Sequence, residues 1–272
     1  MTKIAFCSDL HCDFTEGDIF SDNFLYNKDN SDVLCLLGDT FEIRNHDKFK
    51  DVFYTLAECY PIILFIYGNH CFYNNDILNA KKQMQEFTKD YPNFHILDND
   101  IFELDNLVFV GTTLWTDMNN FNPDVCSAAG YLMNDYRLIR SNAIPDLTTT
   151  DWYCNLKVEE TLGYHLKAVD FIDKQCKLYK DKSIVVLSHH APHPKSTDRD
   201  IDDLQGAYCS DLSDIIIDNE NLILFLHGHC HQEVSYDIEQ CTIMSHPRGY
   251  PNQLFCKEEY DNFKPKLIEI LL

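Results

Sequence analysis

The chain has 272 residues, of which 45% are hydrophobic and 24% are charged. These proportions are ordinary for a globular protein and exclude a disordered or fibrous one. Its charge is unusual, because 44 Asp and Glu residues outnumber 22 Lys and Arg residues and give a net charge of −22. A surface this acidic repels polyanions, so we expect neither nucleic acids nor anionic membranes among the partners, and leave small molecules open.

Cysteine is also frequent, with 12 residues in the chain. None of them forms a Cys-x-x-Cys pair, so zinc ribbons and thioredoxin-like chemistry have no support. The apolar stretch near residue 1 is too short for an export signal and reaches an acid at Asp9. No apolar run approaches the length of a membrane-spanning helix. These features predict reduced thiols and a cytoplasmic location.

Short apolar runs without polar alternation recur along the chain, a pattern typical of strands buried on both faces. These runs are Lys3–Ser8, Asp32–Leu37, Pro61–Tyr67, Lys182–Leu187 and Asn221–Leu226. Between them, the spacing of apolar residues predicts helices over His46–Cys59, Ile77–Lys89 and Trp152–Tyr179. Strands that alternate with helices indicate parallel pairing with crossover helices.

Further strands are expected over Phe94–Gly111 and in the last forty residues. Ile101–Leu104 and Leu107–Val110 flank Asp105-Asn106, which makes a good two-residue hairpin turn. The later strands are Glu233–Glu239, Thr242–Ser245 and Lys266–Leu271. Two groups of strands with helices outside predict an α/β fold built as a layered sandwich.

No repeat, low-complexity tract or long linker interrupts this pattern, so we interpret residues 1–272 as a single domain. The segment Thr112–Thr150 is polar and shows no regular period. It is either a lid or rim over the strand ends or a plain surface insertion, and both alternatives stay open.

Residue types that bind metals directly follow five of the predicted buried strands. The motifs are Asp9-Leu10-His11, Gly38-Asp39, Gly68-Asn69-His70, His189-His190-Ala191-Pro192 and Gly228-His229-Cys230-His231. The site of an open α/β sheet lies outside the carboxyl ends of its strands, so these groups are expected to converge. Any single motif is also compatible with an ordinary turn. All five in this order predict a metal site.

This ordered set of motifs resembles the calcineurin-like metallophosphoesterase superfamily, from Ile4 to about Tyr250. The stretches Gly111–Asp117, Asn134–Arg137 and Pro247–Tyr250 are similar to a branch of small bacterial or phage members. The resemblance implies a four-layer αββα fold, in which two mixed β-sheets pack as a sandwich flanked by helices. It also implies a metal-dependent phosphoric ester hydrolase, either a phosphodiesterase or a phosphatase.

The resemblance further implies a role for each motif residue. The implied ligands are Asp9, His11, Asp39 and His231 for one metal, with Asp39 bridging to a second metal held by Asn69, His189 and His229. His70 would not ligate but would lie over the leaving group as a catalytic residue. We prefer His189 to His190 as the ligand, because it directly follows the strand and stands three residues before Pro192.

All seven ligands offer oxygen or nitrogen, a set that suits two divalent transition-metal ions such as Mn, Fe, Zn, Co or Ni. The charges of two such ions, minus those of two Asp carboxylates, leave a local net charge of about +2. This charge is enough to attract a phosphate into an acidic protein. We therefore expect in-line attack by a bridging hydroxide. Protonation or stabilisation of the leaving oxygen by His70 is a task usually worth about 10²–10⁴-fold.

Several neighbouring side chains are candidates of lower rank. Arg248 and Arg137 could each clamp a phosphate through the planar guanidinium fork, with an ordinary surface arginine as the alternative. Cys12, Cys71 and Cys230 each stand beside a motif histidine, where a buried filler, an oxidation sensor and an extra ligand remain alternatives.

Three functions fit these motifs. The first is hydrolysis of small phosphoesters, including nucleotide-derived ones, with diesters slightly preferred. The second is a DNA nuclease of the SbcD type, which the acidic charge disfavours, as does Cys71 where that branch carries an acid. The third is a catalytically inactive metal-binding scaffold, which is disfavoured because every motif position is retained.

Overall fold

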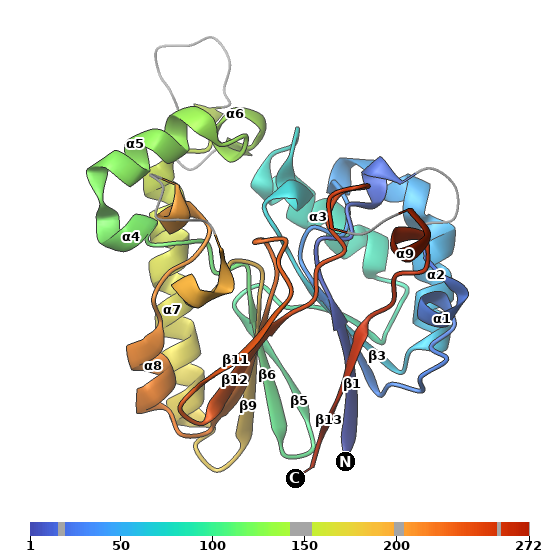
Figure 1. Ribbon diagram of the computed structural model, residues 1–272. Helices are drawn as coiled ribbons and strands as arrows, with labels where there is room; N and C mark the ends of the chain where they lie inside the picture. Colours follow the sequence, from blue (N-terminus) through green and yellow to red (C-terminus); the bar gives the residue numbers. More distant parts are fainter. Residues whose placement is uncertain (16–19, 142–153, 199–203, 255–256, 272) are drawn as a thin grey trace.

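The computed structural model describes residues 1–15, 20–141, 154–198, 204–254 and 257–271. Two β-sheets stand next to each other in the middle of the molecule, and helices cover their outer faces (Figure 1). Within the described residues, no helix combines the length and apolar character needed to cross a bilayer.

The first sheet has five strands in the order β13-β1-β2-β3-β4. Its members are β1 (Thr2–Cys7), β2 (Val33–Leu37), β3 (Ile62–Ile66), β4 (Phe94–Ile96) and β13 (Lys266–Ile270). All are parallel except β13, which runs antiparallel to β1 at the edge. Leu37 lies opposite Ile66, so β2 and β3 end together at one edge of the sheet.

The second sheet has six strands in the order β11-β12-β10-β9-β6-β5. Its members are β5 (Asp100–Leu104), β6 (Leu107–Thr112), β9 (Ser183–Ser188), β10 (Leu222–His227), β11 (Val234–Ile238) and β12 (Cys241–Ser245). The four inner strands are parallel, and hairpins add β5 and β11 antiparallel at the two edges. The hairpin at Asp105-Asn106 is therefore confirmed.

Strand β2 shows how the layers are held together. Val33, Cys35 and Leu37 pack in one apolar cluster with side chains of the second sheet. Leu34 and Leu36 point the other way, into a cluster shared with the helices. A strand that is apolar at every position buries both faces, as expected for the inner strands of parallel sheets. The predicted α/β sandwich is confirmed.

Helices α1 (Asp22–Leu25), α2 (Lys50–Cys59) and α3 (Ile77–Thr88) lie on the side of the first sheet, and α7 (Val158–Leu178) and α8 (Ser213–Asp218) cover the second (Figure 1). A short α9 (Lys257–Asp261) follows in the last part of the chain and buries Tyr260. Helix α7 buries residues at intervals of three or four, which places one stripe against the sheet. That stripe is Val158, Thr161, Leu162, His165, Ala168, Ile172 and Cys176.

Two expectations about the middle of the chain were wrong. The segment from Thr112 holds the short helices α4 (Met118–Phe121), α5 (Pro123–Leu132) and α6 (Asp135–Leu138), whereas residues 142–150 lie outside the described residues. Asn122 caps α5 and Pro123 occupies its first turn, signals that the polar composition had hidden. Helix α7 begins at Val158 rather than Trp152, because Cys154–Asn155 forms β8 and pairs with β7 (Arg140–Ser141).

Candidate metal centre

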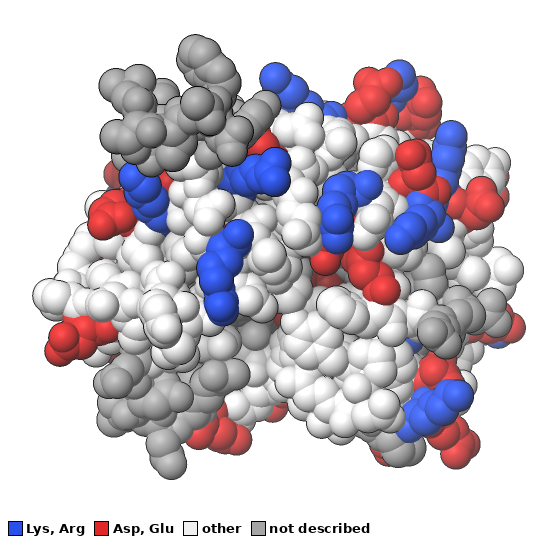
Figure 2. Space-filling view, turned by 90° about the horizontal axis from the view of Figure 1, so that it is seen from above, with Lys and Arg blue, Asp and Glu red and all other residues white. Residues whose placement is uncertain are grey.

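The five motifs lie together at the carboxyl ends of the parallel strands, which form the upper end of the molecule in Figure 1. Figure 2 looks down on this end. Lys and Arg side chains approach the middle of this face, while most Asp and Glu side chains stand nearer its rim. Some Asp and Glu side chains also lie near the middle of this face, next to the cations (Figure 2).

Two motif glycines allow the strand ends to come this close. Gly38 has φ +87°, and a Cβ atom there would overlap the ring of His189. A Cβ atom on Gly68 would overlap the carboxylate of Asp39. Glycine at these turns therefore makes room for side chains from neighbouring strands.

The first group of potential ligand atoms comes from Asp9, His11 and His231. Nε2 of His11 lies 3.0 Å from Nε2 of His231, which in turn lies 3.3 Å from Oδ1 of Asp9. His231 is oriented by Gln253, whose Oε1 is 2.7 Å from Nδ1 of the imidazole. A histidine that donates from Nδ1 turns the Nε2 lone pair toward the site.

The second group comes from Asp39, Asn69, His189 and His229. Nε2 of His189 lies 2.9 Å from Oδ1 of Asn69 and 3.3 Å from Oδ2 of Asp39. Nδ1 of His189 is 2.9 Å from the Leu37 carbonyl, to which it donates. Asp39 belongs to both this group and a group with His11 and His70, which is the arrangement expected of a bridging ligand.

The hydrogen-bonding pattern of these atoms shows that they suit divalent cations. With Nδ1 donating to the Leu37 carbonyl, a neutral His189 presents a lone pair toward the oxygens of Asn69 and Asp39. Three acceptors that face one another need a cation between them or a proton on the imidazole. His229 adds a buried Nε2 that has no hydrogen-bond partner among the residues that the structure describes. Oxygen and imidazole donors suit Mn, Fe, Zn, Co or Ni.

Both buried carboxylates are held in the ionised form. Burial raises the pKa of Asp9, but the nearby His231 and His189 together outweigh burial and lower the pKa to about 2. Burial likewise opposes ionisation of Asp39, and the neighbouring His189 and His70 keep its pKa well below the ordinary value. Negative charge is therefore available at the shared position of the two groups.

The histidines of the site differ in their protonation state. Burial lowers the pKa of His11 to about 3, and burial together with His190 lowers the pKa of His229 well below its ordinary range. Both are neutral, the form that binds metals. Burial also disfavours the charged form of His189, but the carboxylates of Asp39 and Asp9 and the Leu37 carbonyl together outweigh burial and raise the pKa to about 9. A cation bound beside His189 must displace that proton.

His70 lies at the edge of the site between two tyrosine rings. The ring of Tyr73 stacks on it with centroids 4.0 Å apart, and the Tyr250 hydroxyl is 3.2 Å from its Nε2. The ring of Tyr250 also stacks on His11 at 4.3 Å. His70 is near enough to His11 and Asp39 to share a group of potential ligands with them, so its predicted catalytic role needs a separate test.

The backbone is unusual at the same positions. Asp9, His11, Asp39, His229 and His231 all have positive φ, between 43° and 67°. This left-handed region is uncommon for residues other than glycine, and it costs roughly 1–2 kcal/mol per residue. The strand ends thus hold their ligand side chains through sharp turns that a relaxed chain avoids.

Sequence reasoning missed three residues that orient this site. Tyr250 and Asp135 lie in stretches that resemble the family, but no motif chemistry pointed to them. Gln253 follows Tyr250 by one turn and carried no signal. Each acts on a residue far away in the chain, so only the folded structure reveals the contact.

His190 lies behind the second group, in contact with a backbone carbonyl and with the ring of His229. Its Nδ1 lies 3.1 Å from the Thr113 carbonyl, and its ring packs on His229 at 4.2 Å. Burial lowers its pKa to about 3, which keeps it neutral. It holds no place in the groups of potential ligand atoms.

The two candidate arginines differ in their surroundings. Arg248 is only 1% exposed, so it is not a surface side chain, and its guanidinium lies 3.9 Å from the ring centroid of Tyr260. A phosphate arriving from solvent has no direct access to it, and we do not propose it as a phosphate ligand. Arg137 is exposed and donates to the Leu132 carbonyl at 2.7 Å, as a surface arginine does.

The three cysteines beside the motifs are best interpreted as side chains that fill space in the core. Cys12 and Cys71 are buried and Cys230 is partly so, and none belongs to the groups of potential ligand atoms. Burial raises the pKa of Cys12 strongly and that of Cys71 to about 12, so both stay as unreactive thiols.

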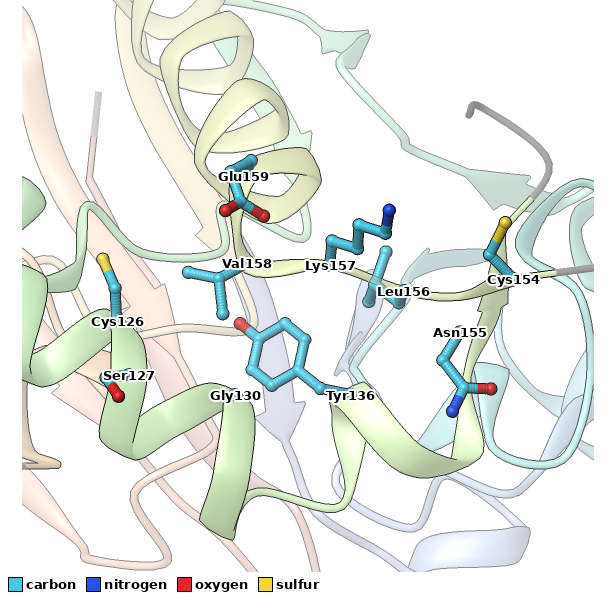
Figure 3. Close-up of a pocket in the computed structure, with 10 residues that line it drawn as sticks. All are labelled: Cys126, Ser127, Gly130, Tyr136, Cys154, Asn155, Leu156, Lys157, Val158 and Glu159. Carbon is cyan, nitrogen blue, oxygen red and sulfur yellow. The ribbon is translucent and has the colours of Figure 1, made fainter. Parts of the chain in front are cut away.

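A cavity of about 640 Å³ lies apart from the ligand atoms, between α5, α6 and the start of α7 (Figure 3). Tyr136 points into it, and Cys126 and Glu159 stand on the opposite side from Cys154. None of its lining residues is a predicted ligand. We assign it no function.

Comparison with known proteins agrees with this geometry. The sequence profile of the calcineurin-like phosphoesterase family matches residues 2–233. An uncharacterized protein of Acanthamoeba polyphaga mimivirus is 28% identical over 287 residues, which cover 97% of this chain and 95% of that protein.

Solved structures with the same fold include the phosphopantetheinyl hydrolase of Mycobacterium tuberculosis. It has a TM-score of 0.68 and 13% identity, over 97% of this chain and 95% of that one. A dimetal phosphatase from Danio rerio has a TM-score of 0.51 and 15% identity, over 90% and 86% of the two chains. The profile match spans most of the chain, and the chain therefore belongs to the calcineurin-like phosphoesterase family of metal-dependent phosphoester hydrolases.

Proposed function

We propose that this protein hydrolyses small phosphoesters with two divalent ions, and that diesters are preferred to monoesters. The observation that carries the proposal is the meeting of two groups of ligand atoms beside Asp39. The first ion would be held by Asp9, His11, Asp39 and His231, and the second by Asp39, Asn69, His189 and His229. Manganese is the ion to be tried first among Mn, Fe, Zn, Co and Ni, all of which suit oxygen and imidazole donors.

The protein's own residues would divide the work as follows. When bound, the two ions supply Lewis acidity and a water that is deprotonated near neutral pH. Asp39 holds the two halves of the site together, and its ionised form is favoured by the surrounding imidazoles. His70 would donate a proton to the leaving oxygen, with its Nε2 directed by the Tyr250 hydroxyl.

The preference for small diesters rests on charge. A net charge of −22 disfavours long polyanions, and the cations on the site face in Figure 2 suit a compact anion. The fold is shared with a phosphopantetheinyl hydrolase, so we add a phosphopantetheinyl substrate to the compounds to be tried.

The decisive experiment compares the wild type with Asp39→Asn in Mn²⁺. The panel contains nucleoside monophosphates, cyclic mononucleotides, dinucleoside polyphosphates, a phosphopantetheinyl protein and single-stranded DNA. We expect turnover of a small substrate by the wild type and loss of both turnover and bound metal in Asp39→Asn. Asp105→Asn makes the same chemical change in the β5–β6 turn and should remain active.

Two outcomes would contradict the proposal. Turnover of DNA alone would favour a nuclease and would show that the acidic surface does not exclude a polymer. Two bound metals without turnover of any compound would favour a scaffold that has kept its ligands.

A further inference from the structure

Asp135 joins the segment after β6 to the metal centre. Its side chain is 1% exposed, and a buried carboxylate needs partners to offset the loss of water. Both partners come from the loop after β3: Oδ1 accepts a hydrogen bond from Nδ2 of Asn69 at 2.8 Å and another from the Tyr73 hydroxyl at 2.7 Å. Asp135 lies in α6, which has no other link to the motif residues among the described hydrogen bonds.

The contact with Asn69 decides which end of the amide faces the metals. The oxygen and NH₂ ends of an asparagine side chain have nearly the same shape, so packing alone selects poorly between them. An ionised carboxylate only accepts hydrogen bonds, and it therefore attracts the NH₂ end. The oxygen is then directed at His189, 2.9 Å from Nε2. An amide turned the other way would present a donor to a cation.

The contact with Tyr73 acts on His70. The tyrosine ring lies flat against the imidazole, with centroids 4.0 Å apart and an angle of 27° between the planes. Because the hydroxyl is tied to Asp135, the ring cannot slide away from His70 without breaking a buried hydrogen bond. One carboxylate thus restrains both a predicted ligand and the predicted proton donor.

We infer that Asp135 is a positioning residue that sets the amide of Asn69 for metal binding and the ring of Tyr73 for contact with His70. This inference rests on the proposed function of the same site. Partners behind the ligands of metal sites commonly change metal affinity by about 10–100-fold when they are replaced. Asp135 belongs to that class, although it comes from a segment that looked like a surface insertion.

The test measures Mn²⁺ binding to the metal-stripped protein by calorimetry, with no substrate present. Asp135→Ala should weaken the site that contains Asn69 by about 10–100-fold. Asp135→Asn keeps the shape but removes the charge that selects the NH₂ end, and it should have an intermediate effect. Asp124→Asn, an exposed residue of α5, is the matched control and should bind Mn²⁺ as the wild type does.

A swapped pair separates positioning from a merely structural role. Asn69→Asp combined with Asp135→Asn exchanges the donor and acceptor, so an oxygen again faces the metal and the hydrogen bond is kept. We expect the folded pair to bind Mn²⁺ more tightly than Asp135→Ala does, with the Tyr73 hydroxyl accepting from the new amide in place of donating to Oδ1. Tyr73→Phe should leave Mn²⁺ affinity unchanged and lower kcat, because it breaks only the contact that serves His70.

Thermal unfolding of each metal-free variant shows whether the fold is intact. Wild-type affinity in both Asp135→Ala and Asp135→Asn would overturn the inference, and so would failure of the swapped pair to recover when each protein is folded. Because Mn²⁺ binding needs no substrate, absence of phosphoesterase turnover in the wild type would count against the proposed function and leave this measurement unaffected.

Discussion

The ring of His70 is contacted by two tyrosines, and its backbone N–H donates to Oδ1 of Asp39 at 2.9 Å. Tyr73 covers one face of its ring, the Tyr250 hydroxyl meets Nε2, and Nδ1 is buried without a hydrogen-bond partner among the described residues. The two tyrosines thus fix the position of the ring from which the proposed donation of a proton to a leaving oxygen would take place.

Replacing His70 tests this role directly. We expect His70→Asn to lower kcat by about 10²–10⁴-fold while two Mn²⁺ ions still bind, because a proton donor is lost and the ligands are kept. The measurement is turnover beside metal content in the same preparation. His46→Asn, a change in the turn before α2, should leave kcat unchanged. Loss of one bound metal in His70→Asn would instead identify His70 as a ligand.

The turns after the strands are the elements on which the site depends. Each parallel strand ends in a tight turn, and the glycines allow neighbouring turns to pack closely. Gly38 is the clearest case, because its φ of +87° disfavours any other residue and the ring of His189 fills the space beside it. The spacing of the motifs is therefore a packing requirement as well as a chemical one.

Alanine at two glycines should have opposite effects. Gly38→Ala combines a strained φ with overlap against His189, so we expect a loss of stability of about 1 kcal/mol or more and weaker Mn²⁺ binding. Gly163→Ala lies inside α7, where a Cβ atom meets nothing within 4 Å, and it should gain about 0.5–1 kcal/mol. Urea unfolding of the metal-free proteins compares them. Equal stability of the two variants would contradict the account of Gly38.

At the scale of the whole molecule, protons and metal ions compete for the same buried site. The pKa of His189 is raised from 6.5 to about 9, so the metal-free protein gains stability from its charged form below pH 6.5. That contribution is lost as pH rises through 9. Asp9 behaves in the opposite sense, since its pKa falls from 3.8 to about 2, and its contribution is lost as pH falls from about 4 toward 2.

Metal binding should therefore release a proton near neutral pH. At pH 7.5 His189 is charged in the metal-free protein, and a cation at Nε2 requires the neutral ring. We expect apparent Mn²⁺ affinity to rise between pH 6.5 and 9, with about one proton released from His189. Calorimetry in two buffers of different ionisation enthalpy measures that number. A pH-independent affinity across this range would show that His189 is neutral before metal binds.

The fold was largely predictable because its signals are local. Continuous apolar runs such as Val33–Leu37 mark buried parallel strands, and a motif follows each of the five strands that carry the site. The short helices α4, α5 and α6 escaped prediction, because helices this short depend on caps and tertiary packing more than on their own period. Met118–Phe121 even forms a left-handed turn, which no helical pattern indicates.

The site was predictable only as far as its motifs extend. The ligand set could be proposed because each residue stands directly after a strand. The residues that orient it could not, since Asn69 and Asp135 are 66 positions apart and His70 and Tyr250 are 180 positions apart. The burial of Arg248 could not be inferred from the sequence for a related reason, because its partner Tyr260 comes from α9.

The left-handed backbone of the predicted ligands makes the requirements of activity conflict with those of stability. The residues concerned are Asp9, His11, Asp39, His229 and His231. Each of these residues occupies a backbone conformation that costs glycine or asparagine less energy. The sequence that binds the metals best is therefore not the one that stabilises the fold best. If selection acted on thermal stability alone, substitutions at these five positions would stabilise the fold most easily. The same substitutions would remove the metal ligands and with them the activity.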